Sequence, residues 1–231
     1  MSEFDDIRQV SPVREPAFNV PRPVWTLIGV LVLAHLARLA LGIDADQLAL
    51  LSTDLPAGRL SGLLTYQFVH GSWVHLAMNS VFILAFGSPV ARFLSGGLRG
   101  ALAFFAFFLL CGAGAAVAFA GFSGLLDAGS PAAEPWALVG ASGAASGLMA
   151  AAARLIQGRG RLGPITGSVV VGMTAGWIAM NLVLGISGLT PGAAGVPVAW
   201  QAHIFGYLFG LLAIAPAGRV AGVKDDHAIA L

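Results

Sequence analysis

The 231-residue sequence is poor in charge, since Asp, Glu, Lys and Arg together make up only 10% of it. A soluble domain carries about 25% charged residues, so this chain has too few to cover a water-facing surface. Its formal net charge of +1 offers no field for nucleic acid, which argues against that class of partner. The single cysteine, Cys111, cannot form an internal disulfide and is interpreted as a buried packing residue.

What the sequence has in quantity is apolar residues, which make up 57% of it. They gather into runs close to the roughly 20 residues that a membrane-spanning helix needs. We therefore expect an all-α membrane protein with six transmembrane helices, of which the fourth is short and rich in glycine and alanine. The predicted membrane domain covers residues 23–217, between polar tails at 1–22 and 218–231. The predicted spans are 24–43, 69–88, 100–121, 139–156, 165–187 and 200–217.

The connections between these runs alternate in charge along the chain. Those at 44–68 and 122–138 are net negative, and those at 89–99 and 154–164 are net positive. Because Lys and Arg favour cytoplasmic loops, the pattern predicts that both termini are cytoplasmic. The second, fourth and sixth spans then run from the outside inward. The expected location is the plasma membrane of a prokaryotic cell.

Four polar side chains fall at one depth in this topology. His75 and Asn79 lie two to three turns into the second span, and Ser142 and His203 lie about one turn into the fourth and sixth. All four are then within about 15 Å of the outer surface. Taken singly, each is also explained by a hydrogen bond inside the bundle. Their common depth favours a functional site, because polar groups within spans are costly.

Ser142 and His203 are the residue types that nucleophilic catalysis requires. A neutral histidine can take the proton of a serine hydroxyl near neutral pH, so they are predicted as nucleophile and base. No Asp or Glu lies inside a predicted span, so the simplest arrangement is a dyad whose imidazole is oriented by packing. His75, Asn79 and the backbone N–H of Ser142 are the predicted donors to an oxyanion.

The helices that carry this pair are also predicted to touch. The fourth span has two glycines four residues apart, as does the sixth, and such faces let membrane helices approach backbone to backbone. The glycines are Gly143 and Gly147 on one helix and Gly206 and Gly210 on the other.

Three motifs resemble those of the rhomboid family of intramembrane serine proteases. They are HxxxN at His75–Asn79, GxSG at Gly140–Gly143 and AHxxGxxxG at Ala202–Gly210, and the resemblance covers about residues 23–217. It implies a six-helix fold with Ser142 as nucleophile, His203 as base, and His75 and Asn79 at the oxyanion site. It also implies peptide-bond hydrolysis without metal or cofactor. The implied partners are the lipid bilayer and single-span membrane protein substrates, cut near the outer face.

Departures from the family pattern occur beside the site and in the first outer loop. Ser146 occupies a position where the family usually has an aromatic packed on the catalytic histidine, and Tyr207 and Trp200 are the candidates to substitute for it. Ser146 is also the rival nucleophile, although it lies one turn deeper than Ser142. In the first outer loop Ser61-Gly62 stands where the family has a Trp-Arg pair, which leaves Arg59 nearby.

Two further polar residues are given structural roles, and two other functions stay open. We expect His70 to tie the first outer loop to the second span, and Asn181 to bond a neighbouring helix. A catalytically inactive relative that binds membrane clients is the first alternative function. A channel or transporter for small solutes, lined by His75, Asn79 and His203, is the second.

Overall fold

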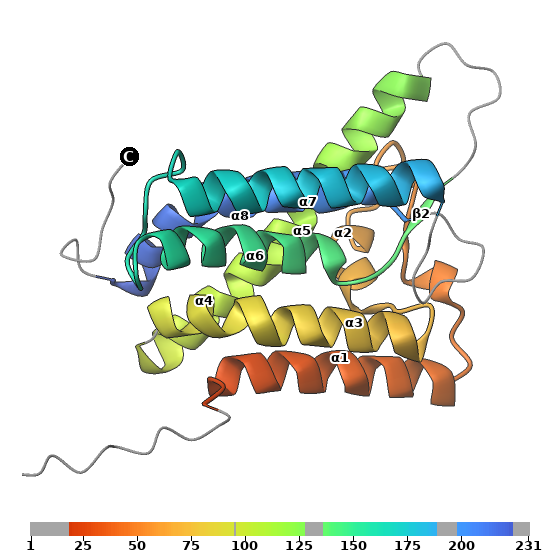
Figure 1. The fold of residues 1–231 in the computed structure, drawn as a ribbon. Helices are drawn as coiled ribbons and strands as arrows, with labels where there is room; N and C mark the ends of the chain where they lie inside the picture. Colours follow the sequence, from red (N-terminus) through yellow and green to blue (C-terminus); the bar gives the residue numbers. More distant parts are fainter. Residues whose placement is uncertain (1–18, 95, 128–135, 189–197, 224–231) are drawn as a thin grey trace, which may run out of the picture.

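The computed structural model describes residues 19–94, 96–127, 136–188 and 198–223, and within them the protein is mostly helical (Figure 1). Most of the two predicted tails, and parts of the connections at 122–138 and 188–199, lie outside these residues. The long helices are α1 (Arg22–Ala40), α3 (Trp73–Phe82), α5 (Gly97–Asp127), α6 (Ser142–Gln157), α7 (Ser168–Ser187) and α8 (Trp200–Ala221). The shorter elements are η1 (Ala45–Gln47), β1 (Leu50–Leu51), α2 (Gly62–Thr65), η2 (Tyr66–Phe68), η3 (Ile83–Gly87), α4 (Ser88–Phe93) and β2 (Ala137–Leu138).

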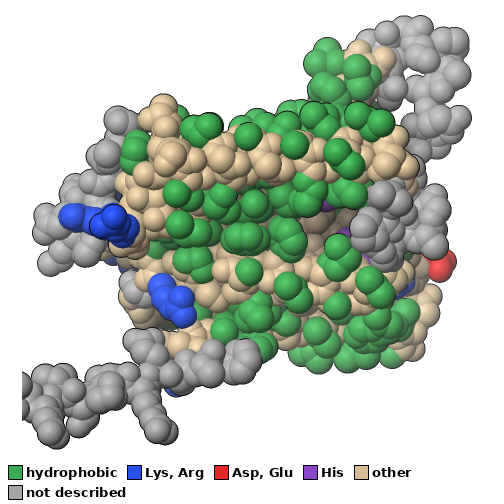
Figure 2. Space-filling view, in the orientation of Figure 1, with side chains coloured by type: hydrophobic (Ala, Val, Ile, Leu, Met, Phe, Trp, Pro, Cys, Tyr) green, Lys and Arg blue, Asp and Glu red, His purple; other side chains and the backbone are tan. Residues whose placement is uncertain are grey.

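Five helical segments are long and apolar enough to cross a membrane. They are α1, the continuous segment Trp73–Phe93 formed by α3, η3 and α4, then α5, α7 and α8. Their outer surfaces expose large apolar side chains, as on Ile186, Leu33 and Val81, which are 87%, 66% and 62% exposed. Figure 2 shows apolar side chains spread over the whole bundle face. A soluble protein rarely exposes so continuous an apolar surface, so the chain is an integral, multi-pass membrane protein.

Helix α6 occupies the centre of the bundle and corresponds to the predicted fourth span. It packs against α5, α7 and α8, and most of its 16 residues are buried. At 1.5 Å per residue it is about 24 Å long, shorter than the roughly 30 Å hydrocarbon core of a bilayer. It is therefore not one of the five segments long and apolar enough to cross a membrane, although it lies between them in the bundle.

Several predicted helix ends differ from those in the structure. Helix α3 starts at Trp73 rather than 69, because Ser72 caps it by accepting a hydrogen bond from the N–H of His75 at 3.1 Å. Helix α6 starts at Ser142 rather than 139, because Gly140 has a φ of +107°, which is incompatible with a helix. Helix α5 covers Gly97–Asp127, well beyond the predicted 100–121, and its end projects from the bundle (Figure 1).

The last helix also runs past its predicted end. Helix α8 continues to Ala221, four residues into the predicted C-terminal tail. Hydropathy places the apolar part of a helix, whereas capping residues and backbone conformation decide where the helix begins and ends.

Charged side chains separate to the two ends of the bundle. At one end of the bundle, the last turns of α4 and α6 carry arginines. At the other end, the first connection carries Asp44, Asp46 and Asp54. Figure 2 shows the larger basic groups at one end of this face and an acidic side chain at the other, the end at which Arg59 pairs with Asp54. The division agrees with the alternating loop charges of the sequence.

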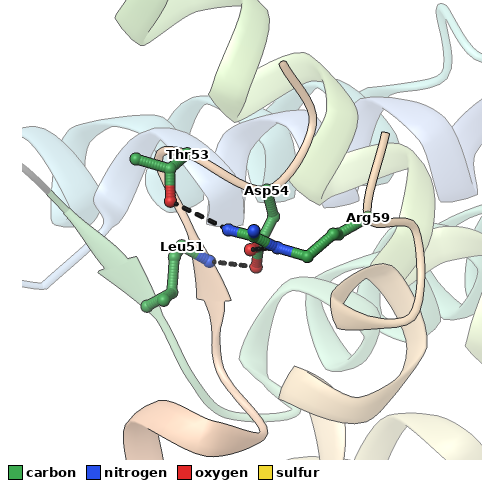
Figure 3. A network of polar contacts seen from close by, with 4 residues as sticks. All are labelled: Leu51, Thr53, Asp54 and Arg59. Atoms are coloured by element: carbon green, nitrogen blue, oxygen red, sulfur yellow. Dashed lines mark hydrogen bonds and ion pairs between the residues drawn. The ribbon is translucent and has the colours of Figure 1, made fainter. Parts of the chain in front are cut away.

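The first connection is held by a local polar network centred on Asp54 (Figure 3). Its carboxylate accepts hydrogen bonds from the Leu51 N–H at 2.9 Å and from Arg59 Nε at 2.8 Å. Arg59 also donates to Thr53 Oγ1 at 3.2 Å. The Leu51 N–H, and after it Arg59, hold the pKa of Asp54 below its ordinary value, although burial opposes them. A methyl group on Gly62 would lie 2.9 Å from Leu50 and 3.2 Å from Asp54, so the packing of the loop selects glycine there.

Candidate active site

The contact between α6 and α8 is made by backbone against backbone, as the paired glycines predict. A methyl group on Gly210 would lie 2.6 Å from the carbonyl carbon of Gly147 and closer still to its oxygen. One on Gly206 would collide with the carbonyl oxygen of Gly143. Real Cβ atoms do not approach backbone so closely, so any larger residue would separate the helices. The predicted glycine contact is confirmed.

This contact brings Ser142 and His203 together. Ser142 is the first residue of α6, rather than one turn into a helix, and His203 is in the first turn of α8. The Oγ of Ser142 lies 2.8 Å from Nε2 of His203, within the distance at which a serine transfers its proton to a base. Both side chains are half-buried. Because Ser142 opens a helix, its own N–H has no partner within that helix and is free to face an anion.

The other ring nitrogen of His203 is bound by a side chain, which the prediction of orientation by packing alone missed. Nδ1 of His203 lies 2.7 Å from Oδ1 of Asn181 on α7. Asn181 does bond a neighbouring helix, as expected, but its partner is the predicted base. The signal was present in the sequence, since an amide in an apolar run needs a partner. Only the packing of α7 on α8 reveals which group that partner is.

The aromatic residue beside His203 is Trp177, and neither Tyr207 nor Trp200 fills that position. The rings of Trp177 and His203 have centroids 6.1 Å apart and are tilted by 38°. Nε1 of Trp177 also donates to the His203 carbonyl at 3.5 Å. Tyr207 instead lies with its hydroxyl 3.1 Å from Thr174 Oγ1. Both candidates lie near His203 along the chain, whereas the aromatic that packs beside it comes from α7.

His75 and Asn79 lie beside the turn that leads into α6. A methyl group on Gly140 would lie 2.7 Å from Cε1 and Nε2 of His75 and 3.7 Å from Nδ2 of Asn79. The missing side chain at Gly140 therefore lets both residues approach the backbone two positions before Ser142. Nδ2 of Asn79 is buried and has no hydrogen-bond partner among the described residues. Such a donor is available to a substrate oxygen.

This turn is fixed by contacts from the first connection. The N–H of Gly140 donates to the carbonyl of Tyr66 at 2.9 Å. Strand β1 pairs antiparallel with β2, Leu50 opposite Leu138, four residues before Ser142. The Tyr66 hydroxyl in turn donates to the Gly112 carbonyl of α5 at 2.7 Å. The connection thus fixes the approach to α6 from two sides.

Ser146, the rival nucleophile, and His70, the predicted structural histidine, both lie buried and take no part in the hydrogen bond between Ser142 and His203. Ser146 is 1% exposed and donates to the carbonyl of Ser142 at 2.7 Å, which commits its hydroxyl to the helix backbone. His70 is fully buried between α1 and α3, with its ring 5.2 Å from that of His75 and 6.4 Å from that of His35. Its carbonyl accepts from Arg38 at 3.3 Å. Across the described part of the chain, no group of three or more His, Cys, Asp or Glu side chains is placed to hold a metal ion.

Comparison with protein-family models identifies the fold that carries this geometry. A model described as "Rhomboid domain" matches residues 57–219. The match contains all three motifs, although it begins later than the expected residue 23 and leaves α1 outside. A comparison with curated proteins gave no match. Because the matched region covers more than half of the 231 residues, the chain belongs to the rhomboid family.

Proposed function

We propose that this protein is an intramembrane serine endopeptidase that uses Ser142 as nucleophile and His203 as general base. The family consists in general of intramembrane serine proteases, which gives the class of reaction. The observation that carries the proposal is the 2.8 Å distance between Ser142 Oγ and His203 Nε2. A serine hydroxyl is a weak nucleophile at its free pKa and needs a base at that range.

The reaction would proceed by acyl transfer. Oγ of Ser142 attacks the scissile carbonyl carbon while its proton moves to Nε2 of His203, giving a tetrahedral intermediate. When the C–N bond breaks, that proton passes to the leaving amine. Water then attacks the acyl carbon, Nε2 takes its proton, and the proton returns to Oγ as the carboxylic acid leaves. Histidine suits both directions of transfer because a neutral imidazole can accept a proton on one nitrogen and then give it up again.

The negative oxygen of the intermediate needs donors that are already in place. The N–H of Ser142 at the start of α6 is one candidate, and Nδ2 of Asn79 is a second. His75 lies against the same turn. Buried donors aimed at a developing oxyanion are usually the largest single contribution to catalysis. We assign the oxyanion site to these three groups.

The proposed topology has six spans, with α6 as the short fourth one and both termini in the cytoplasm. The arginine-rich end of the bundle then faces the cytoplasm. Ser142 begins α6 and Arg154 lies in its last turn, so Ser142 faces the opposite side. The substrates would be single-span membrane proteins, cut near the outer face. A substrate helix must unwind there, because helical hydrogen bonds shield the scissile carbonyl and freed polar groups are costly in lipid.

Labelling with a fluorophosphonate probe tests the proposal directly. The detergent-solubilised wild type should be labelled, and so should Ser146→Ala, which removes a hydroxyl one turn away. Ser142→Ala and His203→Ala should not be labelled, because they remove the nucleophile and its base. Cleavage of a single-span reporter by the same four proteins would then connect the labelled serine to peptide hydrolysis.

Two outcomes would contradict the proposal. A folded wild type that is neither labelled nor able to cut a reporter would favour the client-binding relative. Loss of labelling with Ser146→Ala alone would mean that Ser146 is the nucleophile. Size-exclusion profiles of all four proteins should coincide, which separates a chemical effect from misfolding.

A further inference from the structure

The side chain of Asn181 has its two ends committed to different partners. Its Nδ2 donates to the carbonyl of Trp177, one turn earlier in α7, at 2.9 Å. Its Oδ1 lies 2.7 Å from Nδ1 of His203, and the residue is fully buried. Since the amide nitrogen is used within α7, the group that faces His203 is the carbonyl oxygen, which can only accept. Nδ1 of His203 must therefore carry a hydrogen.

This arrangement decides which nitrogen of His203 is basic. A neutral imidazole has one N–H, so a hydrogen on Nδ1 leaves the lone pair on Nε2. Nε2 is the nitrogen that lies 2.8 Å from Ser142 Oγ. The opposite tautomer would present an N–H to Ser142 and leave Nδ1 facing the Asn181 oxygen without a shared hydrogen. The buried amide thus selects the form of the ring that can accept the serine proton.

The same bond also restrains the orientation of the ring. His203 is linked through Nδ1 to α7 and through Nε2 to α6, while its own backbone belongs to α8. Trp177 adds a third restraint by contacting the imidazole and donating to the His203 carbonyl. After proton transfer the imidazolium has two N–H groups, and Asn181 still accepts one of them. The acceptor therefore suits both states of the base.

We propose that Asn181 is a positioning residue that fixes the tautomer and orientation of His203, so that the site works as a Ser–His–Asn arrangement drawn from three helices. This inference rests on the proposed function, because it gives Asn181 a part in that reaction. It replaces the dyad oriented by packing that the absence of carboxylates suggested.

Three variants on α7 test the inference. Asn181→Leu removes the acceptor at similar volume, and Asn181→Asp keeps an acceptor in the same place. Thr174→Val is the matched control, because it removes a different polar contact between α7 and α8, that of Thr174 with Tyr207. Asn181→Leu should lower the fluorophosphonate labelling rate about 10- to 100-fold, the range expected for loss of one buried hydrogen bond. Asn181→Asp should keep most of the labelling, and Thr174→Val should be labelled like the wild type.

A spectroscopic readout separates positioning from general stability. The ¹⁵N shifts of neutral histidine differ between the two tautomers, and the His203 signal is identified by its loss in His203→Gln. In the wild type, His203 should carry its hydrogen on Nδ1. In Asn181→Leu, the signal should move towards a mixture of tautomers. If Asn181→Leu does not fold, the wild-type tautomer and the Asn181→Asp variant still decide the question.

The possible results distinguish this inference from the proposed function. Wild-type labelling together with unchanged labelling of Asn181→Leu would overturn the inference and leave Ser142 as the nucleophile. A wild-type His203 with its hydrogen on Nε2 would overturn it as well. A wild type that is never labelled would overturn both proposals. An equal loss of labelling in Thr174→Val would also count against positioning, because any weakened contact between α7 and α8 would then suffice.

Discussion

The contact of Gly210 with Gly147 lies about two helical turns from His203, yet it should control the reaction. In Gly210→Ala, the new methyl group would lie 2.6 Å from the carbonyl carbon of Gly147. Non-bonded atoms prefer about 3.5 Å, so the two helices must separate by about 1 Å. The same separation would lengthen the 2.8 Å distance between Ser142 Oγ and His203 Nε2 beyond the limit of a hydrogen bond. A misplacement of about 1 Å costs on the order of 100-fold in rate.

The assay is the second-order rate of fluorophosphonate labelling, divided by the folded fraction from size exclusion. Overpacking costs about 1–3 kcal/mol, so the thermal midpoint in detergent should also fall. Gly172→Ala on α7 is the matched control, because a methyl group there meets no atom within 4 Å. It should change neither quantity. A folded Gly210→Ala that is labelled at the wild-type rate would refute the view that the glycine contact sets the geometry of the site.

Three further predictions concern substitutions of single side chains. Asn79→Ala removes the buried Nδ2, which has no partner among the described residues. It should lower the rate of fluorophosphonate labelling about 10²- to 10³-fold, the usual cost of losing one oxyanion donor. A smaller loss, measured by stopping the labelling at set times, would show that Asn79 is not such a donor. Ser146→Ala should be labelled at the wild-type rate, since its hydroxyl serves the Ser142 carbonyl, and a slower rate would contradict this assignment. Asp54→Asn should be less stable than the wild type at neutral pH. The folded-state pKa of Asp54 is depressed, so its contribution is complete above the ordinary value of about 3.9 and is lost as the pH falls through the folded value. Thermal midpoints of the two proteins should therefore converge at acidic pH, and a constant difference would contradict the role of the carboxylate.

The membrane class and the positions of the long helices were open to prediction, because both depend on properties of single segments. Hydropathy located the five segments that are long and apolar enough to cross a membrane, and the spacing of Gly143, Gly147, Gly206 and Gly210 identified the faces that meet. Helix ends were less accurate, since they depend on local conformations such as the positive φ of Gly140. The role of Ser142 stays a prediction, although its distance to His203 is the one that the prediction requires.

The parts that sequence reasoning missed involve partners far apart in the chain. Asn181 was recognised as needing a partner, but its hydrogen bond to His203 depends on how α7 packs on α8. Trp177 was missed for the same reason, because an indole in an apolar helix has no periodic signature that marks its neighbour. The pairing of β1 with β2 involves only two residues on each strand, too few for a pattern of alternation.

The geometry divides control of His203 between two kinds of contact. The glycines of α6 and α8 set how far the imidazole lies from Ser142, and they do so by steric limits that do not depend on protonation. Asn181 sets which ring nitrogen is basic, and it does so by a hydrogen bond that leaves the helix separation unchanged. A membrane interior offers little hydrophobic drive between helices, so close packing and buried hydrogen bonds must hold such a site together. The absence of a carboxylate from the described spans then has a physical explanation. A neutral amide supplies the acceptor without placing a second charge in an apolar bundle, where an ionised group is costly.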